Sequence, residues 1–169
     1  MENQSSPPSE SESPPSPSTV TKAVDIPLHR VGFLIDELTP SKVSGRLPIT
    51  EICCQPFRVL HGGVSALVAE GLASVGAHMA GGFKRVAGIH LSINHVKSAH
   101  IGDLVYAEAT PFSIGRTLQV WDVHLWKVDP STMKNKSLVS SSRVTLMCNM
   151  PVPEYATDAA EVLRKYAKL

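Results

Sequence analysis

The chain has 169 residues and a mass of 18.2 kDa, which suits a single domain with short extensions. Hydrophobic residues make up 43% and charged residues 18%, so the chain can bury a core and is not a disordered protein. A formal net charge of +1 argues against a nucleic-acid-binding protein, which would carry a strongly basic face.

The three cysteines include the adjacent pair Cys53 and Cys54 and no C-x-x-C spacing. This usage argues against a disulfide framework and against a structural zinc site, and it fits a reducing compartment. No uninterrupted apolar run approaches the roughly 20 residues that span a bilayer, so we expect no membrane partner.

Residues 1–22 are interpreted as a disordered N-terminal tail. Residues 1–18 contain seven Ser and five Pro and offer almost nothing to bury. The stretch lacks the apolar segment of a secretory signal, and it is acidic before Lys22, unlike an organellar transit peptide. The folded domain is therefore assigned to residues 23–150.

The other end, residues 151–169, is interpreted as a surface-lying C-terminal tail that ends Ala167-Lys168-Leu169. A small residue, a basic residue and a terminal Leu resemble the S-K-L peroxisomal address, although loose matches of this kind also arise by chance. The tripeptide favours a peroxisomal location, with a peroxisomal import receptor as a partner.

Within the domain, residues 32–37 and 42–49 are predicted to form a hairpin, and residues 64–80 a helix. Glycine pairs precede and follow the helix, at 62–63 and 81–82. The apolar side chains of the helix recur at steps of three and four residues: Val64, Leu67, Val68, Leu72, Val75 and Met79.

The opposite side of this helix carries small residues where an exposed helix would carry charges: Ala66, Ala73, Ser74 and Ala77. Between Gly62 and Phe83 the only formally charged residue is Glu70. We therefore expect the helix to be buried on nearly every side. Gly71 and Gly76 lower helix propensity, which suggests that neighbours pack close to the helix backbone.

After the helix, apolar and polar residues alternate with the period of two that is typical of strands, over 87–95, 104–111, 117–128 and 138–148. The predicted fold class is α+β, with a curved antiparallel sheet of five or six strands wrapped around one long central helix. One sheet cannot cover a helix on all faces. We therefore predict that a second copy of the chain covers the small-residue face.

Glu70 is the first candidate for chemistry, because an ionised carboxylate on an apolar helix is costly unless it is paired or hydrogen-bonded. Ser74 lies one turn further on, so the two side chains are expected to share a pocket. A purely structural carboxylate, satisfied by backbone amides or by an arginine of a neighbouring chain, is the alternative.

His61, Gly62 and Gly63 precede the helix and leave its first N–H groups open to an oxygen atom, which is the arrangement of an oxyanion hole. A tight turn that needs glycine would have the same sequence, and a lone histidine such as His61 is more often structural than catalytic. Gln55 is a neutral donor and acceptor in the preceding loop.

Other chemistries lack support in the sequence. Gly63-Val64-Ser65-Ala66-Leu67 has Leu where a G-x-S-x-G nucleophile elbow requires its second Gly. His90, His95 and His100 recur at five-residue steps, which puts neighbours on opposite faces of a strand and argues against a shared metal ion.

The run Gln55, His61-Gly62-Gly63, Glu70 and Ser74, followed by Asn94-His95 and Gly115-Arg116-Thr117, resembles the hotdog-fold acyl-CoA thioesterases over residues 32–148. The resemblance is to the group related to 4-hydroxybenzoyl-CoA thioesterase, whose catalytic Glu lies on the central helix. With its C-terminal tripeptide, the chain is similar to the plant peroxisomal thioesterases that act on 1,4-dihydroxy-2-naphthoyl-CoA in phylloquinone (vitamin K1) synthesis.

This resemblance implies an acyl-CoA thioesterase that releases free acid and CoA without a metal or other cofactor. It also implies a homodimer with two sites across its interface, often paired into a homotetramer. It assigns catalytic roles as follows: Glu70 as nucleophile or general base, Gly62 as backbone donor to the thioester oxygen, Gln55 and His61 near the thioester and the attacking water, and Ser74 beside the carboxylate.

Three alternatives remain open from the sequence: a thioesterase for other aromatic or fatty acyl-CoAs, a hydratase or dehydratase of enoyl thioesters, and a non-catalytic acyl-CoA-binding module. A hydratase usually requires an Asp beside a His near the helix start, and the loop around His61 contains no Asp.

Overall fold

A computed structural model describes residues 14–134 and 136–169. Its α-helices are α1 (Pro17–Val24), α2 (Ile26–Arg30), α3 (Gly62–Ala80) and α4 (Glu161–Tyr166). Its strands are β1 (Leu34–Thr39), β2 (Lys42–Pro48), β3 (Arg85–His95), β4 (Leu104–Ile114), β5 (Leu118–Val128) and β6 (Ser137–Met150). Short 3-10 turns follow β2 and precede α4.

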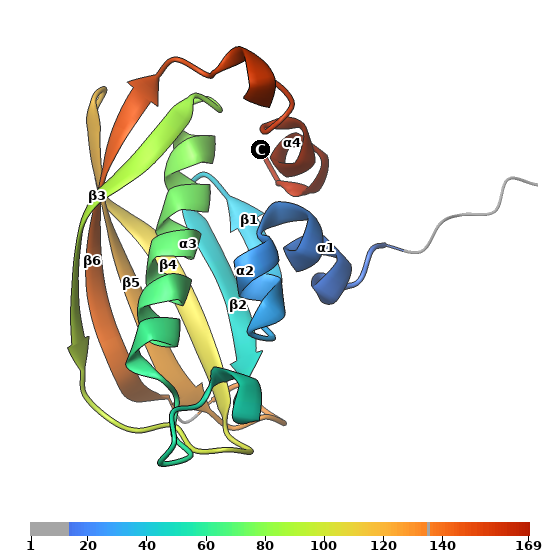
Figure 1. The fold of residues 1–169 in the computed structure, drawn as a ribbon, viewed down its shortest axis with the longest axis vertical. Coiled ribbons are helices and arrows are strands. Elements are labelled where there is room, and N and C mark those ends of the chain that lie inside the picture. Colours follow the sequence, from blue (N-terminus) through green and yellow to red (C-terminus); the bar gives the residue numbers. More distant parts are fainter. Residues whose placement is uncertain (1–13, 135) are drawn as a thin grey trace, which may run out of the picture.

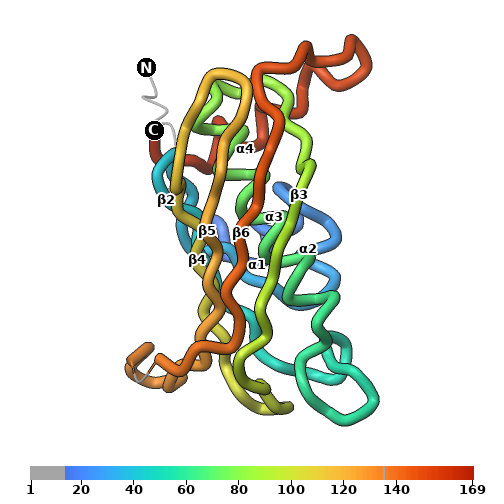
Figure 2. The backbone as a smooth tube through the Cα atoms, turned by 90° about the vertical axis from the view of Figure 1, so that its left-hand side faces the viewer, coloured from blue at the N-terminus to red at the C-terminus, as the bar shows by residue number. Residues whose placement is uncertain are grey.

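All six strands form one antiparallel sheet in the order β1-β2-β4-β5-β6-β3, and α3 runs along its concave face (Figure 1). The predicted α+β architecture, a curved antiparallel sheet wrapped around one central helix, is therefore confirmed. The sheet has two edges. Lys168 donates its backbone N–H to the carbonyl of Leu38 on β1. At the other edge lies β3 (Figure 2), and within the described residues β6 is the only strand that pairs with it.

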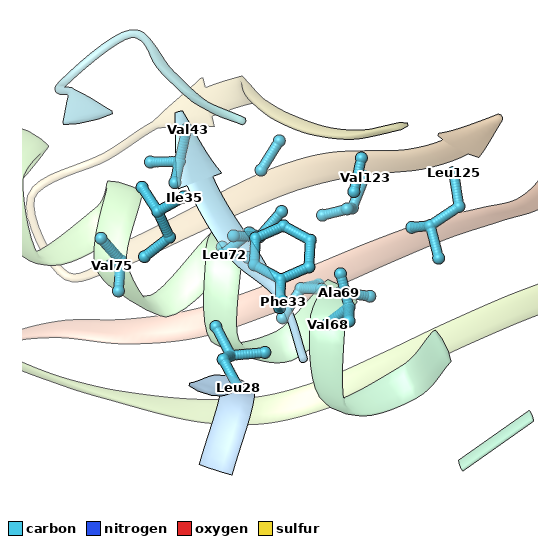
Figure 3. Packing of buried hydrophobic residues seen from close by; sticks show 14 of the residues in the cluster. Leu28, Phe33, Ile35, Val43, Val68, Ala69, Leu72, Val75, Val123 and Leu125 are labelled. Atoms are coloured by element: carbon cyan, nitrogen blue, oxygen red, sulfur yellow. The ribbon is translucent and has the colours of Figure 1, made fainter. Parts of the chain in front are cut away.

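The core lies between α3 and the sheet, and α2 adds to it (Figure 3). Val68, Leu72 and Val75 belong to the helix face that packs into this core, as the three-and-four spacing predicts. Leu28 of α2 and Phe33 are completely buried in the same cluster. The packing therefore fixes how α3 is rotated about its axis, which decides where Glu70 points.

The sequence correctly indicates close neighbours at the two helix glycines. A Cβ on Gly76 would lie 2.5 Å from two ring atoms of Trp121, and a Cβ on Gly71 would lie 3.1 Å from Cδ1 of Leu28. Trp121 is fully buried, and its ring nitrogen donates to Gln119 at 2.9 Å, so the ring is held in place.

Three sequence interpretations need correction. Residues 161–166, assigned to a surface-lying C-terminal tail, form α4, and Leu163 packs into the core. Residues 17–22, assigned to the disordered tail, belong to α1: Ser16 caps the helix, Pro17 occupies its first turn, and Thr21 is buried. Residues 1–13 of that tail lie outside the described residues. Ala73 and Ala77, expected to need a second copy as cover, are already fully buried within the chain, because the strongly curved sheet reaches round them.

By length and mean hydropathy, 1.2 over an 18-residue window, α3 resembles a membrane span. Half of that window is buried inside the fold. Such burial is typical of a core helix. The helix is apolar because it packs against the sheet.

We predict that Gly76→Ala destabilises the fold although alanine is the better helix former. The gain in helix propensity is about 1 kcal/mol, whereas forcing an extra methyl group into a packed core costs about 1–3 kcal/mol or more. Gly71→Ala is the matched control, since the flexible tip of Leu28 can move aside. Urea titration should show a lower midpoint for Gly76→Ala than for Gly71→Ala, and equal midpoints would contradict this packing account.

Candidate active site

One ridge of α3 remains only half-buried in the single chain. Its members are spaced by four residues and all have intermediate exposure: Gly62, Ala66, Glu70, Ser74 and His78. The ridge faces β3, since Glu70 lies against Gly88 and Gly62 lies against His95. Gly62, Glu70 and Ser74 therefore lie on the side of α3 that faces the edge strand. We call this seam between α3 and β3, with a cavity at either end, the groove.

Glu70 and Ser74 are in direct contact, as expected for residues one helical turn apart. The hydroxyl of Ser74 donates to Oε1 of Glu70 at 2.7 Å. A Cβ on Gly88 would lie only 2.8 Å from the same oxygen, so glycine at this point of β3 leaves room for the carboxylate. The hydrogen bond fixes the carboxylate and turns it toward the C-terminal half of α3.

At the start of α3, one backbone N–H group has no hydrogen-bond acceptor among the described residues. His61 is the N-cap, and its Nδ1 accepts the N–H of Gly63 at 2.9 Å, while its carbonyl accepts from Val64 and Ser65. Among the described residues, none accepts the N–H of Gly62. This amide is thus free to donate to an incoming oxygen at the positive end of the helix dipole.

A cavity of about 310 Å³ opens in front of this amide. Gln55 and Gly62 line it together with Ser65, His95 and Lys97, so the structure brings Gln55 and Gly62 together. His61 is not among its lining residues, and its ring caps the helix. For His61 the geometry therefore matches the structural role that the sequence left open.

Two groups are thus assembled in one chain, at different places along α3. Gln55 and Gly62 lie at its start, and Glu70 and Ser74 lie two to three turns further on. Eight residues of α-helix rise about 12 Å, so a single carbonyl group cannot touch the Gly62 amide and the Glu70 carboxylate of the same chain.

The sequence did not identify Gly88, His95 or Asp25 as part of this region. A Cβ on Gly62 would lie 3.1 Å from Nε2 of His95, so this ring lies directly beside the free amide. A glycine inside a strand was the available sign for Gly88, because strand glycines often mark a close approach of another group.

Asp25 joins α1 to α2 and brings a second carboxylate toward Glu70. Its Oδ1 accepts the N–H of Leu28 at 2.8 Å, and its Oδ2 lies 3.5 Å from where a Cβ on Gly71 would be. Burial raises the pKa of Asp25 above its usual 3.8, the Leu28 N–H opposes this shift, and the negative charge of Glu70 adds to it. The groove beside Glu70 is therefore unfavourable for further negative charge.

Within residues 14–134 and 136–169, no three His, Cys, Asp or Glu side chains gather in a way that would hold a metal ion. The polar groups that the described part of the chain presents along the groove are carboxylates, hydroxyls, an amide side chain, imidazoles, a free backbone N–H and, at its two ends, the cationic side chains of Lys97 and Arg85.

The fold is a hotdog fold, with a carboxylate held on its central helix and a free amide at the helix start. The chain belongs to the thioesterase superfamily. The family model of that description matches residues 57–134. These residues include α3, β3, β4 and β5.

Curated relatives point in the same direction. The chain is 57% identical to 1,4-dihydroxy-2-naphthoyl-CoA thioesterase 2 of Arabidopsis thaliana over 84% of this chain and 91% of that protein. It is 31% identical to the 1,4-dihydroxy-2-naphthoyl-CoA hydrolase of Escherichia coli over 68% of this chain and 82% of that one. Among solved structures, thioesterase HI1161 of Haemophilus influenzae shares 29% identity at a TM-score of 0.65, covering 76% of this chain and 86% of that one.

We predict that Asp25→Asn raises the melting temperature at neutral pH. Asn caps a helix about as well as Asp, and it removes a charge that burial and Glu70 disfavour. Because the folded carboxyl binds its proton more tightly than the unfolded one, its charge lowers the free energy of unfolding as pH rises above 3.8. The advantage of Asn should therefore shrink as pH falls from 7 toward 4, as followed by circular dichroism. A loss of stability at pH 7 would show that the charge of Asp25 is favourably paired.

Proposed function

We propose that this protein hydrolyses the thioester of 1,4-dihydroxy-2-naphthoyl-CoA to the free acid and CoA, as a step of phylloquinone (vitamin K1) biosynthesis. The observation that carries the reaction class is the Glu70 carboxylate, fixed by Ser74 in a groove that faces the edge strand. The Arabidopsis and Escherichia coli relatives are named for 1,4-dihydroxy-2-naphthoyl-CoA, which supports the choice of acyl group.

The oxyanion is stabilised by the helix start. The thioester carbonyl oxygen accepts the N–H of Gly62, which has no partner among the described residues and lies at the positive end of α3. One such donor, aimed at the charge that develops during attack, contributes about 3 kcal/mol of transition-state stabilisation. Gln55 lines the same cavity and is assigned a contact with the thioester or the attacking water. His61 acts as a positioning residue, since its ring and carbonyl hold the helix start in place.

Glu70 supplies the base or the nucleophile. As a base, its carboxylate takes a proton from water while the water oxygen attacks the carbonyl carbon, and the tetrahedral intermediate then expels the CoA thiolate, which takes up a proton. As a nucleophile, it forms a mixed anhydride with release of CoA, and water then hydrolyses the anhydride. Both routes use only groups of the chain and water, so the proposal requires no cofactor, and CoA is part of the substrate and a product.

The site is completed by a second copy of the chain. Within one chain the Gly62 amide and the Glu70 carboxylate are about 12 Å apart along the helix axis, and Ser74 draws the carboxylate further from Gly62. A carbonyl that touches both groups therefore needs Gly62 from one copy and Glu70 from the other. This supports the homodimer with two equivalent sites, which can pair into a homotetramer.

The unpaired edge of β3 supplies the contact. Eleven residues of backbone lie along this edge with no partner strand among the described residues, which is a template for pairing with the same strand of another copy (Figure 2). Because Gly88 lies against Glu70 and His95 lies against Gly62, an antiparallel β3 pair with Gly88 opposite His95 would bring Glu70 of one copy to Gly62 of the other. The register of β3 shifts by one residue between Gly88 and His90, so the two-fold axis then passes at Ser92.

We also propose a peroxisomal location, with an import receptor reading Ala167, Lys168 and Leu169. Leu169 is 74% exposed, which supports access to the end of the chain, although the N–H of Lys168 is bonded to Leu38. An N-terminal fluorescent fusion should enter peroxisomes, and should lose this location when Leu169 is deleted. Import that survives the deletion would contradict the proposal.

We predict that Glu70→Gln abolishes most turnover while the fold is retained. Glutamine keeps the shape and still accepts from Ser74, but it neither takes a proton from water nor attacks a carbonyl. Thiol release from 1,4-dihydroxy-2-naphthoyl-CoA, followed with a thiol reagent, should fall by about 10²–10⁴-fold, the range of a general base. Near-normal release would end the proposal.

The wild-type protein in the same assay separates the alternatives. Thiol release from benzoyl-CoA or long-chain acyl-CoA, with none from 1,4-dihydroxy-2-naphthoyl-CoA, would show that the protein is a thioesterase for a different acyl group. Binding without release would make the chain an acyl-CoA-binding module, and loss of enoyl absorbance without thiol would make it a hydratase.

A further inference from the structure

A second cavity, of about 370 Å³, lies at the far end of the groove from Gly62. Ser74 and His78 of the α3 ridge form one side, the first residues of β3 form another, and Val24 at the end of α1 contributes a third. The remaining side comes from the segment that follows β6, residues 151–166, which we call the C-terminal cover. In Figure 1 this segment, in red, passes from the end of β6 over the C-terminal end of α3 to α4.

Ser74 joins this cavity to the catalytic group. The same hydroxyl that lines the cavity donates to Glu70 at 2.7 Å. The cavity therefore begins within one side chain of the carboxylate, on the side opposite to the polar cavity at Gln55 and Gly62. A thioester held at Glu70 therefore has this cavity within reach of its acyl part.

The lining of this second cavity is mostly apolar. Its apolar members come from four separate parts of the chain: Val24, Val75, Val86, Val152, Pro153, Ala156, Ala159 and Leu163. Arg85 is the only charged lining residue, and the ring of His78 is held by a contact between its Nδ1 and the carbonyl of Lys84 at 2.7 Å. Such a lining suits a ring-sized apolar group and disfavours the amides and phosphates of CoA.

The C-terminal cover is anchored at its far end and exposed in its middle. Leu163 is 6% exposed and belongs to the core, and Lys168 is bonded to β1. Tyr155, by contrast, is 89% exposed. The cover also lies outside residues 57–134, which the family model matches. The exposed middle of the cover is therefore the part whose side chains can change without altering the sheet or α3.

We propose that this cavity binds the acyl group of the thioester, and that the C-terminal cover sets which acyl groups fit. This inference rests on the proposed function. The ligand class is a bulky, largely apolar acyl group such as an aromatic bicycle, with the CoA arm left outside this cavity. The cover is thus a determinant of substrate specificity and does not take part in the bond-breaking steps.

The test places a larger side chain in the cavity and changes only residues of the C-terminal cover. Ala156→Phe places a ring in the cavity, and Val152→Phe does so from a second position should the first variant be unstable. Thr157→Phe is the matched control, since Thr157 is next to Ala156 but does not line the cavity. The kcat/KM of each variant is measured by thiol release from 1,4-dihydroxy-2-naphthoyl-CoA and acetyl-CoA, together with the inhibition constant of free CoA.

We expect the filling variants to lower kcat/KM for the naphthoyl thioester by about tenfold to a hundredfold, the range over which a pocket discriminates by size. Their ratio of acetyl-CoA to naphthoyl-CoA hydrolysis should rise, the inhibition constant of CoA should stay unchanged, and Thr157→Phe should behave as wild type. Equal losses for both thioesters, or weaker inhibition by CoA, would overturn the inference and assign the cavity to another part of the substrate. If the wild-type protein hydrolyses no thioester at all, the proposed function itself fails.

Discussion

Eight residues of α-helix separate the free amide of Gly62 from the carboxylate of Glu70, and this spacing decides how the proposed site is assembled. The helix is rigid and rises about 12 Å over this interval, and Ser74 holds the carboxylate at its far end. The two groups that the proposed mechanism uses are therefore fixed in one chain at a distance that no carbonyl can bridge. The same rigidity makes the groups useful when two copies face each other in opposite directions, because each helix then contributes a different group to each of two sites.

The composition of α3 follows from this arrangement. The helix must pack into a curved sheet on one side and offer small residues, a carboxylate and a bare amide on the other. Gly76 admits the buried ring of Trp121, and Gly71 admits Leu28 of α2. Outside the helix, Gly88 leaves room for the Glu70 carboxylate on the edge strand. The helix gives up intrinsic propensity at two positions, and its stability comes from tertiary packing.

Much of the fold was predictable from the sequence, because local periodicity determined it. The helix and the strands after it follow steps of 3.6 and two residues, and the contact between Glu70 and Ser74 follows from helix geometry alone. Asp25 and His95 were not assigned to the site, because only tertiary packing brings α2 and the end of β3 to the ridge. Helix α1 was missed for a different reason. Its Ser- and Pro-rich start is typical of a tail, and here the same residues form the cap and the first turn.

The shared site is tested most directly by mixing two inactive variants. Glu70→Gln removes the carboxylate, and Gly62→Pro removes the amide hydrogen. Proline suits this first helical position, and His61 before it is already extended (φ −69°, ψ 129°). Gly62→Ala is the control that adds a Cβ but keeps the amide. After the two inactive variants are unfolded and refolded together, half of the dimers should be mixed.

Each mixed dimer carries one site with both defects and one site with neither. We expect each variant alone to be nearly inactive and the mixture to recover roughly a quarter of wild-type thiol release, because random pairing of subunits makes half of the dimers mixed. A mixture that stays as inactive as its components would show that each site is built from a single chain.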